Sequence, residues 1–111
     1  MKIVIAGAGA VGFHLARELG VEGHNIAIID VDAEKLEYLR DRLDVLTVQG
    51  GATSKKSLES AGAADADLFI AVSNQDEVNM LACAAAHAMG VRRTLARVRN
   101  PHPALEEAAH G

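Results

Sequence analysis

Aromatic side chains are almost absent from the 111-residue chain, which has two phenylalanines, one tyrosine and no tryptophan. Half of the residues are nevertheless apolar. The core must therefore be built from aliphatic side chains and alanine. The length is that of one domain with a single core.

Cysteine is equally scarce, since Cys83 is the only one. This excludes an intramolecular disulfide and a zinc-knuckle spacing, and we expect a reduced, intracellular compartment. The five histidines are scattered without the short spacing typical of metal ligands. We therefore expect no metal site and read Cys83 as an inert buried thiol.

Long apolar runs and an excess of positive charge are both missing. No stretch approaches the roughly 20 apolar residues that a membrane-spanning helix needs, and the N-terminus does not resemble a signal peptide. We expect no direct membrane insertion. Eleven basic residues stand against fifteen acidic ones, a net charge of −4, which argues against nucleic acid as a partner.

What the chain does have is a regular alternation of two patterns. Short aliphatic runs typical of strands covered on both faces occupy residues 3–6, 26–29, 45–48 and 68–72, and a less buried strand is expected at 94–99. Helical patterns lie between them. The predicted features are an apolar stripe of Val11, Leu15 and Leu19 ended by Gly20, a helix capped by Asp32, a short helix over 54–61 ended by Gly62, and a stripe of Val78, Leu81, Ala82, Ala85 and Met89 ended by Gly90.

This order predicts an α/β fold, a doubly wound parallel sheet of five strands in the order 3-2-1-4-5 with helices on both faces. After Asn100 and Pro101, residues 102–107 look like the first turns of another helix. We therefore expect residues 1–111 to form a single domain that is a fragment, truncated in the helix after the fifth strand.

Three glycines follow the first strand in the pattern GxGxxG. Gly7 permits a tight turn, Gly9 lets a diphosphate approach the backbone, and Gly12 allows close packing of helix against strand. The helix that starts there offers free N–H groups and a partial positive charge to phosphates. The pattern predicts a dinucleotide or adenine-nucleotide site.

Asp30 ends the second strand, 18 residues after Gly12, where a carboxylate can accept both ribose hydroxyls. It would repel a 2′-phosphate, at a cost of up to about 4 kcal/mol for two charges about 4 Å apart at an effective dielectric of about 20. Residues 31–34 offer no arginine to offset this repulsion. We expect NAD to be preferred to NADP.

These stretches together resemble a known family. MKIVIAGAGAVGFHLARELG, IIDVDAEKLEYL, QGGATSKKSLESAGAADADLFIAVSNQDEVNMLAC and ARVRNP are similar, in order and register, to the nucleotide-binding domain of the TrkA proteins. Those are the KTN or RCK-N regulators of bacterial potassium uptake. The resemblance implies a Rossmann-like regulator and not an enzyme.

The resemblance also implies a ligand, partners and a location. The ligand would be NAD+ or NADH, or alternatively ATP or ADP. The domain would self-associate as a dimer or ring and pass its ligand state to an integral-membrane potassium transporter. It would be cytoplasmic, held at the inner face of the membrane through that partner.

Carried over position by position, the resemblance implies a set of binding residues. They are the loop Gly7, Ala8, Gly9, Ala10, Val11 and Gly12 at the pyrophosphate, Asp30 at the ribose, Gly51 and Ala52 at the adenine, Ser73 and Asn74 beside the second half of the ligand, and Arg97 against phosphates. Arg99 is a weaker candidate. Asp76 and Glu77 open the fourth predicted helix, where we expect their negative charges to interact favourably with the helix dipole. We expect Asn79 to serve the first turn of the same helix.

Two other functions remain open from the residues alone. The chain could be the cofactor-binding half of an NAD-dependent oxidoreductase, although it offers no obvious proton donor near a nicotinamide. ATP hydrolysis is disfavoured because no GxxxxGK[ST] loop is present. The sequence does not separate NADH, NAD+, ADP and ATP, which share adenosine and diphosphate.

Overall fold

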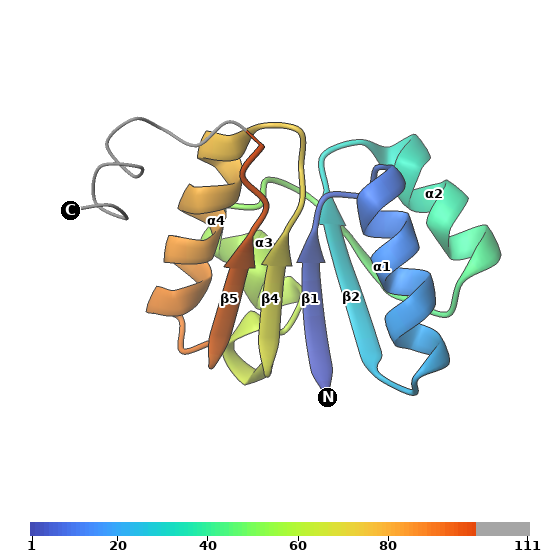
Figure 1. Cartoon of the computed structure of the whole chain (residues 1–111), viewed down its shortest axis with the longest axis horizontal. Helices are drawn as coiled ribbons and strands as arrows, with labels where there is room; N and C mark the ends of the chain where they lie inside the picture. Colours follow the sequence, from blue (N-terminus) through green and yellow to red (C-terminus); the bar gives the residue numbers. More distant parts are fainter. Residues whose placement is uncertain (100–111) are drawn as a thin grey trace.

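The computed structural model describes residues 1–99. Within that range, strands and helices alternate along the chain (Figure 1). The strands are β1 (Lys2–Ala6), β2 (Asn25–Asp30), β3 (Leu46–Gln49), β4 (Leu68–Ala71) and β5 (Arg93–Ala96), and the helices are α1 (Ala10–Val21), α2 (Ala33–Arg42), α3 (Lys55–Ser60), the 3₁₀ helix η1 (Ala63–Asp65) and α4 (Asp76–Ala88).

The five strands form one parallel sheet in the order β3-β2-β1-β4-β5. The predicted fold class and strand order are confirmed. β1 lies between β2 and β4, so the chain first moves to one side of β1 and then returns to the other side. The order reverses at the carboxyl end of β1, which is where open α/β sheets place their ligand clefts.

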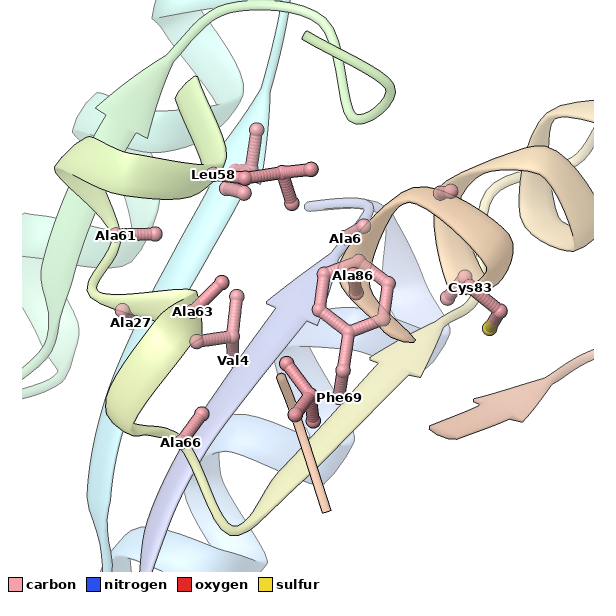
Figure 2. Packing of buried hydrophobic residues seen from close by; sticks show 14 residues of the cluster. Val4, Ala6, Ala27, Leu58, Ala61, Ala63, Ala66, Phe69, Cys83 and Ala86 are labelled. Carbon is pink, nitrogen blue, oxygen red and sulfur yellow. The ribbon is translucent and has the colours of Figure 1, made fainter. Parts of the chain in front are cut away.

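Successive residues of each strand pack on opposite faces of the sheet. Ile3 and Ile5 of β1 belong to an aliphatic cluster with α1 and α2, whereas Val4 and Ala6 belong to a second cluster with α3 and α4. Figure 2 shows this second cluster, in which Phe69 of β4 lies among the alanines of β1 and α4. Helices cover both faces, as predicted, and alanine lets them approach the sheet closely.

Helix α1 extends beyond the residue that was expected to end it. Gly20 lies inside the last turn, and the chain turns instead at Gly23, whose φ of +89° suits glycine. The prediction at Gly20 was wrong because its backbone has no positive φ. Val11 is also 36% exposed, so it does not continue the buried stripe.

Helix α4 is rotated relative to the predicted stripe. Its buried residues are Asn79, Ala82, Cys83 and Ala86, while the expected core residue Leu81 is 61% exposed. The prediction followed the largest apolar side chains. The sheet instead packs against small residues, and Asn79 is buried because its polar atoms all find partners. Gly90, with a φ of +104°, follows the end of the helix as predicted.

The remaining elements agree with their predicted positions, apart from their exact ends. Asp32 caps α2 by accepting the N–H groups of Glu34 and Lys35, and Ser54 caps α3. β5 is less buried than the central strands, as expected, but it ends at Ala96, so Arg97 and Arg99 lie beyond it. The helix predicted after residue 101 lies outside the described residues.

Candidate functional site

A cleft with a volume of about 790 Å³ opens at the carboxyl edge of the sheet. The segments that follow all five strands contribute to it. The residues of the predicted site that line it are Gly7, Gly9, Ala10, Val11, Asp30, Gly51, Ala52, Ser73, Asn74 and Arg97. Ala8 and Gly12 are buried and do not line it.

Glycine is required at two positions around the start of α1, in the preceding loop and in the first turn of the helix, for different reasons. Gly7 has a φ of +120°, and a Cβ there would also lie 3.0 Å from the backbone nitrogen of Ser73. A Cβ at Gly12 would overlap the carbonyl oxygen of Gly7. The first glycine thus allows the turn, as predicted. The third allows close packing of α1, although the backbone that it meets is that of Gly7, just after the strand that was expected.

Gly9 differs from both, because a Cβ at this position would meet no atom within 4 Å. Its backbone is extended, and it precedes the first residue of α1. The fold therefore does not need glycine here. Gly9 also lines the cleft, and a bare backbone at this point leaves room for a ligand.

The N-terminus of α1 is suited to an anion. The first backbone bond of the helix is donated by Phe13 to Gly9. Among residues 1–99, the N–H groups of Ala10, Val11 and Gly12 have no acceptor. No acidic residue lies in this first turn, whereas α4 starts with Asp76 and Glu77. The helix dipole and free donors thus favour negative charge at α1 and not at α4.

Asp30 lies half-buried at the end of β2 and accepts two backbone hydrogen bonds. The N–H of Ala8 donates to Oδ2 at 2.7 Å, and the N–H of Asp32 donates to Oδ1 at 2.8 Å. An ionised carboxylate offers about four acceptor positions. Two positions remain for other donors in the cleft.

The small residues after β3 serve two separate purposes. A Cβ at Gly50 would overlap the side chain of Ser57, so Gly50 lets α3 pack closely. A Cβ at Gly51 would meet only Ser54, at 4.0 Å. Gly51 therefore leaves open space in the cleft that Asp30 and Ala52 also line.

Ser73, at the end of β4, is held by a buried amide. The backbone N–H of Ser73 and its hydroxyl both donate to Oδ1 of Asn79, at 2.9 and 2.7 Å. Nδ2 of Asn79 donates in turn to the carbonyl oxygens of Ser73 and Arg97, at 3.0 and 2.9 Å. The expectation that Asn79 serves the first turn of α4 was wrong. It joins the segments that follow β4 and β5.

Arg97 and Arg99 occupy different places, although only Val98 separates them in the sequence. Arg97 lines the cleft, and its guanidinium has no hydrogen-bond or ion-pair partner among residues 1–99. Arg99 does not line the cleft, and its Nη2 donates to the carbonyl oxygen of Asn74 at 2.6 Å. The structure therefore favours Arg97 over Arg99 as a contact for a ligand.

Sequence reasoning missed Lys35, which lines the cleft from the first turn of α2. The expected preference for NAD over NADP rests on the absence of arginine from residues 31–34, and Lys35 follows them directly. The position of Lys35 just inside a helix that begins at the end of β2 could have revealed it. Thr53, Gln75, Val78 and Leu81 also line the cleft without having been predicted.

Cys83 is buried, as predicted, and lies outside the cleft. Desolvation by burial raises the pKa of its thiol, while hydrogen bonds with the backbone of Ala71 and the side chain of Thr94 partly oppose that shift. The described part of the chain contains no cluster of three or more residues suited to hold a metal ion. No helix in it is both long and apolar enough to cross a bilayer.

A doubly wound sheet with a glycine loop before α1 and a carboxylate at the end of β2 defines a Rossmann-type domain. The model of the TrkA-N domain family matches residues 3–107. The chain belongs to the TrkA-N domain family.

Curated relatives agree with this assignment. The chain is 49% identical over 100 residues to the Trk system potassium uptake protein TrkA of Halomonas elongata, a match that covers 89% of this chain and 22% of that protein. It is 43% identical over 110 residues to TrkA of Vibrio alginolyticus, covering 98% and 24%. The chain thus spans less than a quarter of the length of these relatives.

Among solved structures, the Kef CTD of Shewanella denitrificans in its AMP-bound form has a similar fold. The TM-score is 0.71 at 25% sequence identity, and the match covers 86% of this chain and 57% of that one.

Proposed function

We propose that this chain is a regulatory nucleotide-binding domain that senses NAD+ or NADH, with ATP or ADP as the alternative ligand. One observation carries the proposal. Free N–H groups at the start of α1 and the half-buried carboxylate of Asp30 border the same cleft. A diphosphate fits the first and a ribose the second, and the two are joined in every adenine nucleotide.

Other residues of the cleft extend this assignment. Gly51 and Ala52 leave space for the adenine, and Asn74 offers an exposed amide to the second half of the ligand. Arg97 supplies a positive charge for phosphates. The AMP bound to the Kef CTD, a similar fold, supports an adenine nucleotide here.

The test is isothermal titration of residues 1–111 with NADH, NAD+, NADPH, ADP and ATP. We expect binding of NADH or NAD+ and weaker binding of NADPH. A ligand at about 100 times its Kd should also stabilise the fold by about 2.7 kcal/mol. Absence of binding by all five nucleotides would contradict the proposal.

Gly9→Ala is the matched variant for this titration. The fold has room for the methyl group, and alanine at this N-cap position should lower the free energy of unfolding by no more than about 1 kcal/mol. The methyl group would project into the cleft where the diphosphate is expected, and affinity should fall about tenfold or more. If Gly9→Ala and the unchanged protein bound the nucleotide with equal affinity, the diphosphate would not bind at this loop.

We further propose that the domain acts within a longer polypeptide that controls an integral-membrane potassium transporter from the cytoplasmic side. The names of the relatives support this role, although the chain spans only part of their length. A domain that switches a partner must bind its ligand differently in two arrangements. Self-association as a dimer or ring would provide such arrangements, and residues 1–111 would then be one domain of the assembly.

A chimera tests the role in potassium uptake. Residues 1–99 replace the corresponding segment of the Halomonas elongata relative, and growth is measured at limiting potassium in cells that lack their own TrkA. We expect the chimera to restore growth and the same chimera with Gly9→Ala to fail. If both chimeras restored growth equally, potassium uptake would not depend on ligand binding in the cleft.

The regulatory role is favoured over an oxidoreductase by the residues of the cleft. Those that line it within residues 1–99 include no histidine, tyrosine or cysteine, and the one lysine among them, Lys35, lies in the first turn of α2, on the side of Asp30 where the adenosine is expected. We therefore expect no oxidation of bound NADH, followed by its absorbance, with a panel of carbonyl substrates. Turnover of any of them would reverse this preference.

A further inference from the structure

The carboxylate of Asp30 connects three segments of the site. Oδ2 accepts from Ala8 in the loop after β1, and Oδ1 accepts from Asp32 at the start of α2. The carbonyl oxygen of Asp30 accepts from Gly50 after β3 at 3.0 Å. Asp30 is therefore fixed from both sides and can fix the glycine loop in turn.

Of these three bonds, the one from Ala8 is made directly to the glycine loop. Distances of 2.7 and 2.8 Å are those of short hydrogen bonds to an ionised acceptor. The preceding N–H, that of Gly7, donates to the carbonyl oxygen of Ile29 at 2.9 Å. Two successive N–H groups thus bind the end of β2, whereas those of Ala10, Val11 and Gly12 have no acceptor within the described residues.

We propose that Asp30 is a positioning residue for the diphosphate site as well as a ribose acceptor: through Ala8 it holds the glycine loop in its binding shape before any ligand arrives. This inference rests on the proposed nucleotide site. The two roles are compatible because two acceptor positions of the carboxylate remain open for ribose hydroxyls. A loop held in advance loses less conformational freedom on binding, which raises affinity.

The two roles can be separated with a ligand that has no ribose hydroxyls. Affinities of ADP and 2′,3′-dideoxy-ADP are measured by titration for the unchanged protein and for Asp30→Ala. If Asp30 only accepts ribose hydroxyls, dideoxy-ADP should bind the variant equally well, or more tightly because a negative charge near the phosphates is gone. If Asp30 also holds the loop, dideoxy-ADP should bind the variant about tenfold more weakly.

Two further variants control for charge and for folding. Asp32→Ala removes a carboxylate that lines the same cleft but accepts only from Glu34 and Lys35, so it should not weaken binding of dideoxy-ADP. Asp30→Asn keeps one acceptor oxygen without the charge and should lose less affinity than Asp30→Ala. If Asp30→Ala does not fold, Asp30→Val, which also has no acceptor for the N–H of Ala8, takes its place. Weaker binding of dideoxy-ADP by that variant supports the proposal, and unchanged or tighter binding overturns it.

A ligand-free measurement tests the proposal independently of nucleotide binding. Amide hydrogen exchange of Ala8 should be slow in the unchanged protein and at least tenfold faster in Asp30→Ala, or in Asp30→Val if the alanine variant does not fold. The amide of Gly7, which donates to Ile29, should stay protected in both. Equal exchange of Ala8 in the two proteins would overturn the positioning role, whereas failure of every nucleotide to bind would overturn only the proposed function.

Discussion

The side chain of Asn79 reaches the backbone of Arg97, 18 residues further along the chain, through a hydrogen bond of 2.9 Å. The same amide binds Ser73 by three further hydrogen bonds. One buried residue of α4 thus fixes the two segments that carry Ser73, Asn74 and Arg97 into the cleft. Asn79 is 1% exposed, and no buried side-chain polar atom of residues 1–99 lacks a partner.

Asn79→Leu should destabilise the fold strongly. Leucine has a similar volume, so the main effect is that backbone groups of Ser73 and Arg97 lose their partners inside the protein. We expect the free energy of unfolding in urea to fall by about 2–4 kcal/mol. Asn74→Ala is the control, because Asn74 is exposed and its side chain makes no hydrogen bond within the described residues. It should change stability by less than about 0.5 kcal/mol, and similar losses for both variants would contradict the role of Asn79.

Two glycines of α1 should respond oppositely to alanine. At Gly12 the new Cβ would overlap the carbonyl oxygen of Gly7, which is backbone and cannot easily move. We expect a loss of about 2 kcal/mol or more. At Gly20 nothing lies within 4 Å, and alanine should stabilise the helix by about 0.5–1 kcal/mol. Thermal midpoints of the two variants check this, and a rise for Gly12→Ala would contradict the close packing of Gly12 against the backbone of Gly7.

Arg97→Met should reduce the affinity for ligands with phosphates and leave that for adenosine unchanged. A guanidinium bound to a phosphate contributes about 1.5–3 kcal/mol, so affinity for ADP or NADH should fall about tenfold or more. Added salt should weaken the binding of ADP to the unchanged protein more than to the variant.

Arg99→Met is the matched control for Arg97. Its side chain binds the carbonyl oxygen of Asn74 and does not line the cleft, so affinity should change less than about twofold. If Arg99→Met weakened binding of ADP as much as Arg97→Met, the assignment of Arg97, and not Arg99, as the contact for phosphates would be wrong.

Cys83 should make stability depend on alkaline pH. Because burial raises the pKa of the folded thiol, the folded state keeps a proton at a pH where the unfolded chain has lost it. Stability should therefore fall as pH rises through the ordinary thiol pKa, by at most about 1.4 kcal/mol per pH unit.

The measurement is urea unfolding from pH 7 to 10 under reducing conditions, for the unchanged protein and Cys83→Ala. Other groups titrate in this range, so the test is the difference between the two proteins. That difference should shrink as pH rises, and a constant difference would mean that the folded thiol ionises at its ordinary pKa.

Much of the fold and of the candidate site could be read from the sequence, because the relevant information is local. Aliphatic runs that alternate with helical patterns predicted the strand order. The glycines of the loop and Asp30 follow strands at fixed distances, and parallel strands bring their carboxyl ends to one edge. Gly20 and Leu81 were misread for the same reason, since a local pattern reveals neither the backbone angle nor which helix face meets the sheet.

The sequence alone determined the doubly wound sheet, the glycine loop and the acidic residue that ends the second strand. Only the tertiary structure decided that Asn79 is buried between the ends of β4 and β5, that Asp30 binds Ala8, and that Lys35 and Arg97 border the cleft while Arg99 does not. The spacing of apolar residues along the sequence indicates which side chains are buried in a strand or helix. Which polar groups find partners depends on segments that are far apart in the chain and meet only when it is folded.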